Sequence, residues 1–393
     1  MRVAKMKEKK FETTAIRTQI ERSQFLEHSN PIYLTSSFVF EDAEDMRASF
    51  AEEKDRNIYS RYANPNSSEF INKVCQMEGA EDGFAFASGM AAVFSTFAAL
   101  LNSGDHILSA RSIFGSTHSL FTNFFPRWNI DHSYFKFDEL DQVEKLITPR
   151  TKLIYAESPT NPGVDILDLE VLGDIAKKHN LIFVIDNCFA TPYLQRPIQF
   201  GADLVIHSGT KLMDGQGRVM AGITVGKKEF IDRIYQFSRI TGPALSPFNA
   251  WVLSKSLETL AVRVDRHCSN ALQLAEFLEG HEKVNWVKYP FLKSHPNHEL
   301  AKKQMKAGGC VVAFEVKGGL KAGRKFFDAI ELLSLSANLG DSRSIITHPA
   351  STTHSKLSSE ERLETGITDG MVRISVGLEH IDDIISDIDQ ALG

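Results

Sequence analysis

The 393-residue sequence has few cysteines and no long apolar run, and both facts limit what the protein can be. Its four cysteines, Cys75, Cys188, Cys268 and Cys310, form no C-x-x-C pair, so we expect neither a zinc ribbon nor a thioredoxin-type redox motif. Scattered thiols in a long chain favour a cytoplasmic location. No stretch is long enough to span a bilayer, and the first residues lack the apolar core of a secretory signal.

Excess basic charge is also missing, because the formal net charge is −6. This value argues against a general nucleic-acid or anionic-membrane surface, although a local anion site stays open. The sequence has no internal repeat, low-complexity tract or Pro/Gly/Ser-rich linker. An apolar content of 42% and a charged content of 24% are ordinary for a globular enzyme.

The spacing of apolar residues predicts a largely parallel α/β sheet. Residues 1–60 are polar and show little periodicity, so we expect an N-terminal arm. Beyond residue 80, short apolar runs alternate with amphipathic stretches such as residues 168–180, a pattern typical of strands joined by helices. The predicted strands are 83–87, 105–110, 152–157, 181–186, 202–207 and 221–226.

The pattern changes again after a long helical stretch at residues 251–280. Mixed strand and helix patterns follow, and they predict a smaller α+β domain at the C-terminus. The predicted domains are therefore an arm at residues 1–60, a large domain at 61–255 and a C-terminal domain at 256–393.

Polar residues follow several predicted strands, at the edge where α/β sheets bind ligands. Ser88, Gly89 and Met90 begin a predicted helix, and its N-terminal N–H groups could hold an anion. Asp186 ends another strand, where it could bind a metal, cap a helix or pair with a cationic nitrogen. Asn161 lies between two prolines. Taken singly, these residues are more often an N-cap, a turn residue and a rigid loop.

The stretch "HSGTK" places Ser208, Thr210 and Lys211 directly after the fifth predicted strand. Hydroxyls can hold a phosphate, and a lysine whose pKa is lowered can form a Schiff base. A lone loop lysine usually faces water. Together, however, a phosphate cradle, a carboxylate, an amide and a lysine at strand ends are the parts needed to hold pyridoxal 5'-phosphate.

Other motifs fit less well. Residues 215–220 begin like G-x-G-x-x-G but lack the third glycine, and no G-x-x-x-x-G-K-[ST] occurs. Residues 208–211 match the S-x-x-K of serine acyl hydrolases, but no K-T-G follows. His295 and His298 have metal-like spacing in a polar loop without further ligands, so we expect them to be solvated and predict no metal site.

The sequence resembles the cystathionine γ-synthase family, the Cys/Met-metabolism enzymes that use pyridoxal phosphate, from about residue 12 to the C-terminus. The motifs that carry the resemblance occur in the family's order: "YSRYANPN", "ASGMAA", "ESPTNP", "DNCFATP", "HSGTK", "HPASTTH" and "MVRISVGLE". The resemblance implies fold type I, with a mostly parallel seven-stranded sheet in the large domain and a smaller α+β C-terminal domain.

The resemblance also implies roles for individual residues. Lys211 would bind the coenzyme aldehyde and move protons, and Asp186 would pair with the pyridine nitrogen. The phosphate would be held by Ser88, Gly89, Met90, Ser208 and Thr210. The family is usually a homotetramer, in which Tyr59 and Arg61 would reach the phosphate of a neighbouring subunit.

The substrate α-carboxylate would be bound by Asn161 and Arg373, since a forked guanidinium suits bidentate pairing. Three departures from the family pattern carry information. Phe114 stands where many members stack a tyrosine over the coenzyme, and phenylalanine cannot donate a proton. Arg111 and Arg218 stand where many members have acidic residues, which suggests a substrate with an additional carboxylate.

The stretches "ARSIFGST", "DGQGRVMAG" and "ANLGDSRSIITHPASTTH" look most like the O-succinylhomoserine sulfhydrylase branch of the family. The expected reaction replaces succinate by sulfide to give homocysteine. O-acetylhomoserine as the donor, cystathionine synthesis and γ-elimination remain alternatives on the same scaffold. A serine acyl hydrolase at Ser208 and a coenzyme-binding protein without turnover are the alternatives from other classes.

Overall fold

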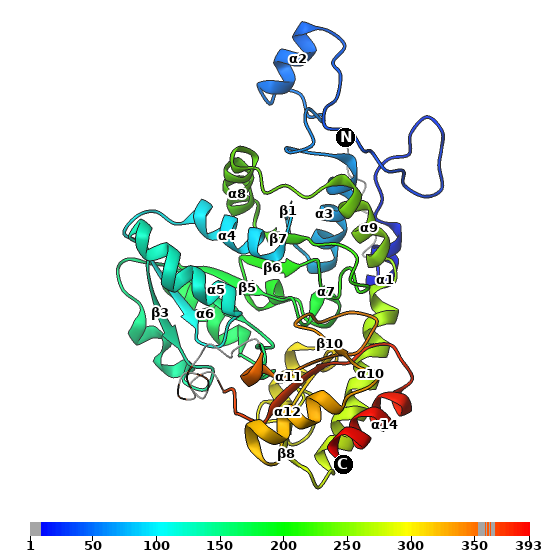
Figure 1. The fold of residues 1–393 in the computed structure, drawn as a ribbon. Helices are drawn as coiled ribbons and strands as arrows, with labels where there is room; N and C mark the ends of the chain where they lie inside the picture. Colours follow the sequence, from blue (N-terminus) through cyan, green and yellow to red (C-terminus); the bar gives the residue numbers. More distant parts are fainter. Residues whose placement is uncertain (1–8, 353–357, 359, 361, 363–365) are drawn as a thin grey trace.

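The computed structural model describes residues 9–352, 358, 360, 362 and 366–393. Within these residues the chain forms a seven-stranded sheet and a five-stranded sheet, each covered by helices (Figure 1). This is the expected α/β architecture, and the prediction of fold class is confirmed. No described helix is long and apolar enough to cross a membrane.

The large sheet has the order β1-β7-β6-β5-β4-β2-β3, in which only β7 runs opposite to the other strands. All six predicted strands are present, with ends shifted by up to two residues. The strand that the sequence did not predict is β3, a polar strand at the sheet edge. The bounds are β1 Asp82–Phe86, β2 His106–Ala110, β3 Asp131–Phe135, β4 Thr151–Glu157, β5 Ile182–Asp186, β6 Leu204–Ser208 and β7 Gly222–Gly226.

Helices cover the large sheet, and several of them begin with a side-chain cap. Ser88 caps α4 by accepting the Ala91 N–H, and Asp168 caps α6 by accepting the Glu170 and Val171 N–H groups. The segment that contains α2 stands out from the body of the molecule (Figure 1). The bounds are α1 Phe11–Arg17, α2 Ala43–Phe50, α3 Pro65–Glu78, α4 Gly89–Leu100, α5 Gly115–Ser119, α6 Leu169–Lys178, α7 Thr191–Leu194, α8 Lys228–Thr241 and α9 Pro247–Leu257.

The smaller sheet has the order β10-β11-β12-β9-β8 and is antiparallel except for the β10–β11 pair. Its strands are β8 Val284–Lys288, β9 Val311–Val316, β10 Ser334–Leu335, β11 Ile345–Thr347 and β12 Met371–Ser375. The helices of this part are α10 Leu260–Glu279, α11 His298–Gln304, α12 Gly319–Ala329 and α14 Ile381–Leu392.

The long helical stretch predicted at residues 251–280 is two helices, α9 and α10, separated near Glu258 and Thr259. The buried apolar residues form two clusters, one around each sheet. Helix α10 contributes to both, with Val264 in the first cluster and Leu274 in the second. The two sheets are therefore joined through one continuous helix whose N-terminal half packs on the large core.

Candidate active site

The candidate site lies at the carboxyl ends of three neighbouring strands of the large sheet. Lys211 follows β6, Asp186 ends β5, and Asn161 follows β4. Because β6, β5 and β4 are adjacent and parallel, their ends meet at one edge. The lysine, the carboxylate and the amide that the sequence singled out therefore share one sheet edge.

A cradle for an anion is present beside this edge. The first N–H groups of α4 have no partner within the helix, and the helix dipole favours negative charge there. Gly89 approaches the end of β6 so closely that an added Cβ would lie 2.9 Å from Ser208 Oγ. Thr210 is tied to β7, since its Oγ1 accepts the Ala221 N–H at 3.0 Å. Backbone N–H groups and a hydroxyl thus converge as a coenzyme phosphate requires.

The Lys211 side chain is held within the site by a residue that the sequence did not indicate. Its Nζ donates a hydrogen bond to Asn338 Oδ1, in the loop before β11. Burial lowers the pKa of the Lys211 amine, and the positive charge of Arg373 acts in the same direction. A lowered pKa raises the fraction of neutral amine, which is the form that attacks an aldehyde.

Arg373, on β12, is buried and fixed by three neighbours. Its guanidinium donates to Asn161 Oδ1 at 2.9 Å, to the Asn338 carbonyl at 3.1 Å and to Thr347 Oγ1 at 3.4 Å. Burial lowers the pKa of Arg373 to about 10, so the group stays charged at neutral pH. The structure therefore brings together Asn161 and Arg373, the two residues expected at the substrate α-carboxylate.

The Asp186 carboxylate is oriented by the backbone that follows it. Its Oδ1 accepts the Cys188 N–H at 2.9 Å. Burial raises the pKa of Asp186, while this N–H and the field of His207 oppose the rise. His207 is itself buried and contacts Glu78 Oε1 at 2.7 Å. Asp186 is therefore a carboxylate held at a fixed position, suited to a cationic nitrogen.

The loop after β2 carries two of the unusual residues. The Phe114 side chain is 45% exposed, and its backbone N–H donates to Glu157 Oε1 at 2.7 Å. The guanidinium carbon of Arg111 lies 5.1 Å from the centre of the Tyr134 ring, a cation–π contact. An aromatic ring without a hydroxyl and a cation therefore occupy the same loop.

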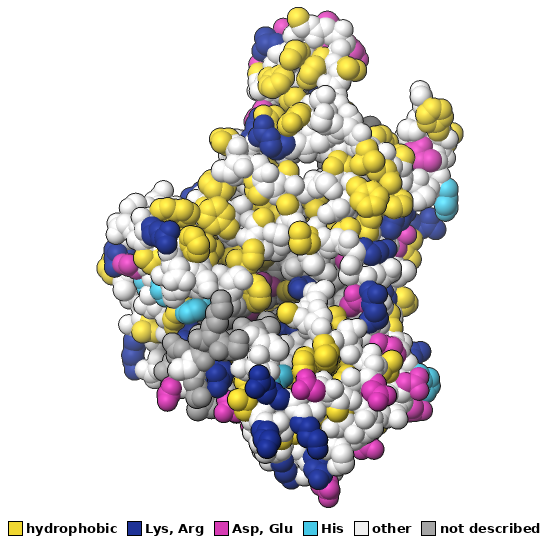
Figure 2. Space-filling view, viewed as in Figure 1, with side chains coloured by type: hydrophobic (Ala, Val, Ile, Leu, Met, Phe, Trp, Pro, Cys, Tyr) yellow, Lys and Arg dark blue, Asp and Glu magenta, His cyan; other side chains and the backbone are white. Residues whose placement is uncertain are grey.

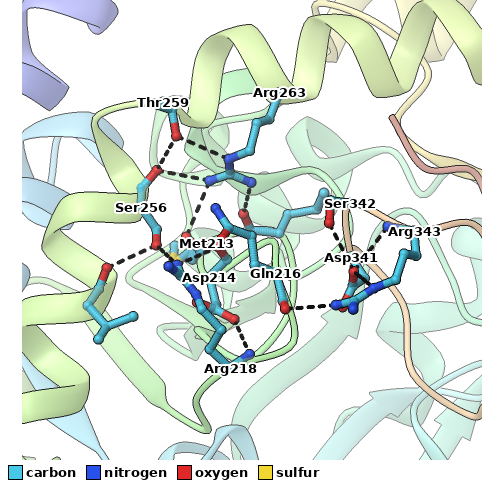
Figure 3. Close-up of polar contacts among 12 residues, drawn as sticks. Met213, Asp214, Gln216, Arg218, Ser256, Thr259, Arg263, Asp341, Ser342 and Arg343 are labelled. Atoms are coloured by element: carbon cyan, nitrogen blue, oxygen red, sulfur yellow. Dashed lines mark hydrogen bonds and ion pairs between the residues drawn. The ribbon is translucent and has the colours of Figure 1, made fainter. Parts of the chain in front are cut away.

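Arg218 lies differently from what its place in the sequence suggested. Its guanidinium pairs with Asp214 at 2.8 Å and donates to Ser256 Oγ, as Figure 3 shows. The Asp214 carboxylate is fully buried, so this arginine balances a charge of its own loop.

Arg61 lies against the end of α8, and Tyr59 lies beside Arg61. The Arg61 guanidinium donates to the Arg239 carbonyl and lies 5.4 Å from the centre of the Tyr59 ring. In the part of the chain that the structure describes, no hydrogen bond connects either residue to Ser208 or Lys211 of the same chain.

The expectation for His295 is wrong. Its side chain is 3% exposed, because the polar loop packs beside Asp165 and Lys288 instead of standing in water. Among the described residues no group of three His, Cys, Asp or Glu side chains could hold a metal. The same residues contain no hydrogen bond between Ser208 Oγ and Lys211 Nζ, so nothing here supports an S-x-x-K nucleophile.

Sequence reasoning missed two residues that touch the candidate machinery. Asn338 contacts both Lys211 and Arg373, yet its stretch carries no chemical signature beyond polarity. Glu157 was visible as a carboxylate at the end of a predicted strand, the same signal that marked Asp186. The last two residues of the "HPASTTH" motif lie outside the described residues.

Comparisons with known proteins agree with this geometry. The chain is 45% identical over 382 residues to the O-succinylhomoserine sulfhydrylase of Pseudomonas aeruginosa, covering 97% of this chain and 95% of that protein. It is 41% identical over 383 residues to the L-methionine gamma-lyase of Fusobacterium nucleatum subsp. polymorphum, covering 97% of each.

A solved structure of a putative O-acetylhomoserine (thiol)-lyase from Campylobacter jejuni superposes with a TM-score of 0.92 at 37% identity, covering 97% of this chain and 99% of that one. That crystal structure contains N'-pyridoxyl-lysine-5'-monophosphate, a lysine that carries the coenzyme. The family model described as Cys/Met metabolism PLP-dependent enzyme matches residues 12–393. The chain therefore belongs to the Cys/Met metabolism PLP-dependent enzymes, and its coenzyme is pyridoxal phosphate.

Proposed function

We propose that the protein transfers the 3-amino-3-carboxypropyl group of O-succinylhomoserine to sulfide, giving homocysteine and succinate. The observation that carries this proposal is the loop after β2, which joins the cation Arg111 to a ring without a hydroxyl, Phe114. A cation near the site suits a donor with a second carboxylate. A ring that cannot donate a proton disfavours the γ-lyase reaction, in which that hydroxyl is expected to help.

The relatives support the proposal to different degrees. Two further O-succinylhomoserine sulfhydrylases, both from Mycobacterium tuberculosis strains, are 45% identical to this chain. The methionine γ-lyases follow at 40–43%. The identities to the two groups of enzymes are so close that they support the family but do not distinguish the substrate. The proposal for the substrate therefore depends on the residues of the site.

The coenzyme, when bound, withdraws electrons from the substrate α-carbon. Lys211 is placed to take the α-proton and to return it, because burial favours its neutral amine and Asn338 fixes its Nζ. Arg373 and Asn161 orient the α-carboxylate through a guanidinium that is already positioned before substrate arrives. Succinate then leaves the γ-carbon, and the sulfur of sulfide forms the new bond there.

Arg111 is the residue that we assign to the distal carboxylate of the succinyl group. The Tyr134 ring supports its guanidinium from one side. Arg218 is the weaker candidate, since its charge already balances the buried Asp214 carboxylate.

We also propose a homo-oligomer, usually a tetramer in this family, with shared active sites. Tyr59 and Arg61 make no hydrogen bond to the phosphate cradle of their own described chain, which suits a role toward the phosphate of a neighbouring subunit. Apolar side chains gather over α2 and over the face that carries α4 and α8 (Figure 2). Exposed apolar residues include Leu34, Val39, Met46 and Phe50 of the described arm, Ile240 of α8, and Phe124 and Trp128 of the segment that follows α5. A second copy of the chain would cover such a surface.

The test supplies the purified protein with sulfide and either O-succinylhomoserine or O-acetylhomoserine, and measures homocysteine. We expect a preference for the succinyl ester in kcat/KM. The variants Arg111→Gln and Arg218→Gln are compared, with Arg150→Gln as a surface control because Arg150 is exposed and pairs with Asp131 of the edge strand β3. We expect Arg111→Gln to lower the succinyl preference about tenfold to a hundredfold, as one charged contact is worth about 1.5–3 kcal/mol.

Other results would redirect the proposal. An equal or greater rate with the acetyl ester keeps the coenzyme chemistry but removes Arg111 as the selector. Release of 2-oxobutanoate from methionine as the main product would instead identify a γ-lyase, the activity named for several relatives. Incorporation of cysteine in place of sulfide would identify a cystathionine synthase.

A further inference from the structure

Glu157 and Asp186 are two carboxyl groups side by side at the coenzyme edge of the large sheet. They end β4 and β5 and stand opposite each other in the register of these paired strands. Side chains that stand opposite each other on neighbouring strands point to the same face and lie within contact range. Asp186 has an assigned partner in the coenzyme, whereas Glu157 has no role in the proposed reaction.

Two like charges cannot both persist at such a place. Glu157 is 6% exposed, so water does little to stabilise a charge on it. Burial and the charge of Asp186 raise the pKa of Glu157, while the Phe114 N–H works in the opposite direction. Asp186 receives the Cys188 N–H and feels His207, and both favour its ionised form. The proton that the pair retains therefore belongs on Glu157.

A neutral Glu157 can keep its hydrogen bonds, although the two donors by themselves favour the ionised form. Its Oε1 accepts two donors, the Phe114 N–H at 2.7 Å and the Tyr155 hydroxyl at 3.2 Å. A carbonyl oxygen has two lone pairs and can accept both, which leaves Oε2 to carry the proton. The bond to Phe114 also fixes the backbone at the residue whose ring is exposed at the site.

We propose that Glu157 is a positioning residue that stays protonated at neutral pH and holds the Phe114 loop through Oε1, so that Asp186 is the single negative charge beside the pyridine nitrogen. The inference rests on the roles assigned above to Asp186 and Phe114. It adds that the two carboxyl groups have different roles. Asp186 carries the negative charge, and Glu157 holds the backbone of the Phe114 loop in place.

The neutral isostere provides the first test. In Glu157→Gln the amide oxygen keeps both hydrogen bonds and the NH₂ group replaces the acid O–H. We expect the affinity for pyridoxal phosphate to stay within about threefold of wild type, and the spectral pKa of the bound coenzyme to stay unchanged. In Glu157→Leu the Phe114 N–H loses its acceptor, and we expect coenzyme affinity to fall by about tenfold or more. A spectral pKa that falls by about one unit in Glu157→Gln would show an ionised Glu157 and overturn the proposal.

Infrared spectroscopy supplies a readout that does not depend on activity. The holoenzyme at neutral pH should show the carbonyl band of a protonated glutamic acid, absent from Glu157→Gln. If that variant does not fold, Tyr155→Phe serves instead, because loss of the Tyr155 bond should shift the same band to higher frequency. A band absent from wild type, or unchanged in the variant measured, would refute the proposal.

Asp186→Asn separates this inference from the proposed function. If Asp186→Asn leaves the coenzyme spectrum unchanged, Asp186 does not pair with the coenzyme. The premise that Asp186 carries the charge while Glu157 stays neutral then fails as well. If the spectrum changes in Asp186→Asn but the infrared band of Glu157 is missing, the coenzyme site stands and only the protonated Glu157 is wrong.

Discussion

Replacing Arg263 by methionine should loosen the loop that carries Lys211. Arg263 lies on α10 with a buried side chain, and its guanidinium donates to the Leu212 carbonyl at 2.7 Å and to the Ser256 carbonyl at 2.9 Å. Figure 3 shows this group between α10 and the loop that follows Lys211. The loop is fitted closely around it, because a Cβ at Gly215 would lie 1.9 Å from Arg263 Nη1.

The magnitude follows from the two short bonds. A hydrogen bond from a charged donor contributes about 1.5–3 kcal/mol, so the two carbonyls lose about 3–6 kcal/mol of gross interaction. Removing a buried charge offsets part of this loss, because its desolvation penalty disappears as well. We expect the free energy of unfolding to fall by about 2–4 kcal/mol. We also expect weaker coenzyme binding, since the backbone that fixes Lys211 is no longer held.

The assay is urea unfolding of the coenzyme-free protein, with coenzyme affinity measured separately. Arg266→Met is the matched control, because Arg266 is exposed on the same helix and its loss should change stability by less than about 0.5 kcal/mol. If Arg263→Met costs no more than the control, the buried carbonyls do not depend on the guanidinium. If stability falls and coenzyme affinity does not, Arg263 supports the fold without positioning Lys211.

Three further predictions concern other parts of the molecule. Burial lowers the pKa of His267 from 6.5 to about 4. The stability that this neutral imidazole contributes above pH 6.5, about 3 kcal/mol, should therefore be lost as pH falls through 4. The urea midpoint of His267→Asn should depend less on pH than that of the wild type. Gly222→Ala should lower the free energy of unfolding by about 1–3 kcal/mol and weaken coenzyme binding, because its Cβ would lie 2.2 Å from the Ser88 carbonyl oxygen, whereas Gly115→Ala, with open space, should do neither. Arg373→Lys should raise KM for the amino-acid substrate about tenfold or more, since the forked pairing is lost, while the dissociation constant of the coenzyme stays unchanged.

The fold could be predicted well where periodicity dominates. Six strands of the large sheet appear within two residues of their predicted ends, because buried strands are short apolar runs between helical patterns. The strand β3 escaped prediction because "DHSYF" is polar, as an edge strand can be. The break between α9 and α10 also escaped, since the periodic pattern runs on through Glu258 and Thr259.

The site could be predicted only as far as strand ends identify it. Lys211, Asp186 and Asn161 follow strands, so topology alone brings them together. Asn338 reaches Lys211 from a loop 127 residues further along the chain, and nothing in its local sequence encodes that approach. The solvated interpretation of His295 failed for the same reason, because burial of a loop depends on the surface onto which it folds.

The roles of Arg111 and Arg218 depend on the groups that each guanidinium contacts, which the sequence does not show. Both positions carry a basic residue where the family often has an acidic one. Their contacts differ in the structure. Arg218 compensates the carboxylate of Asp214, which is fully buried in the same loop, whereas Arg111, on the loop of Phe114, lies over the Tyr134 ring. Removing the charge of Arg218 would leave Asp214 buried without its ion-pair partner, and the cost would appear first as lost stability. A change in donor preference is therefore expected of Arg111, and a loss of stability is expected first of Arg218.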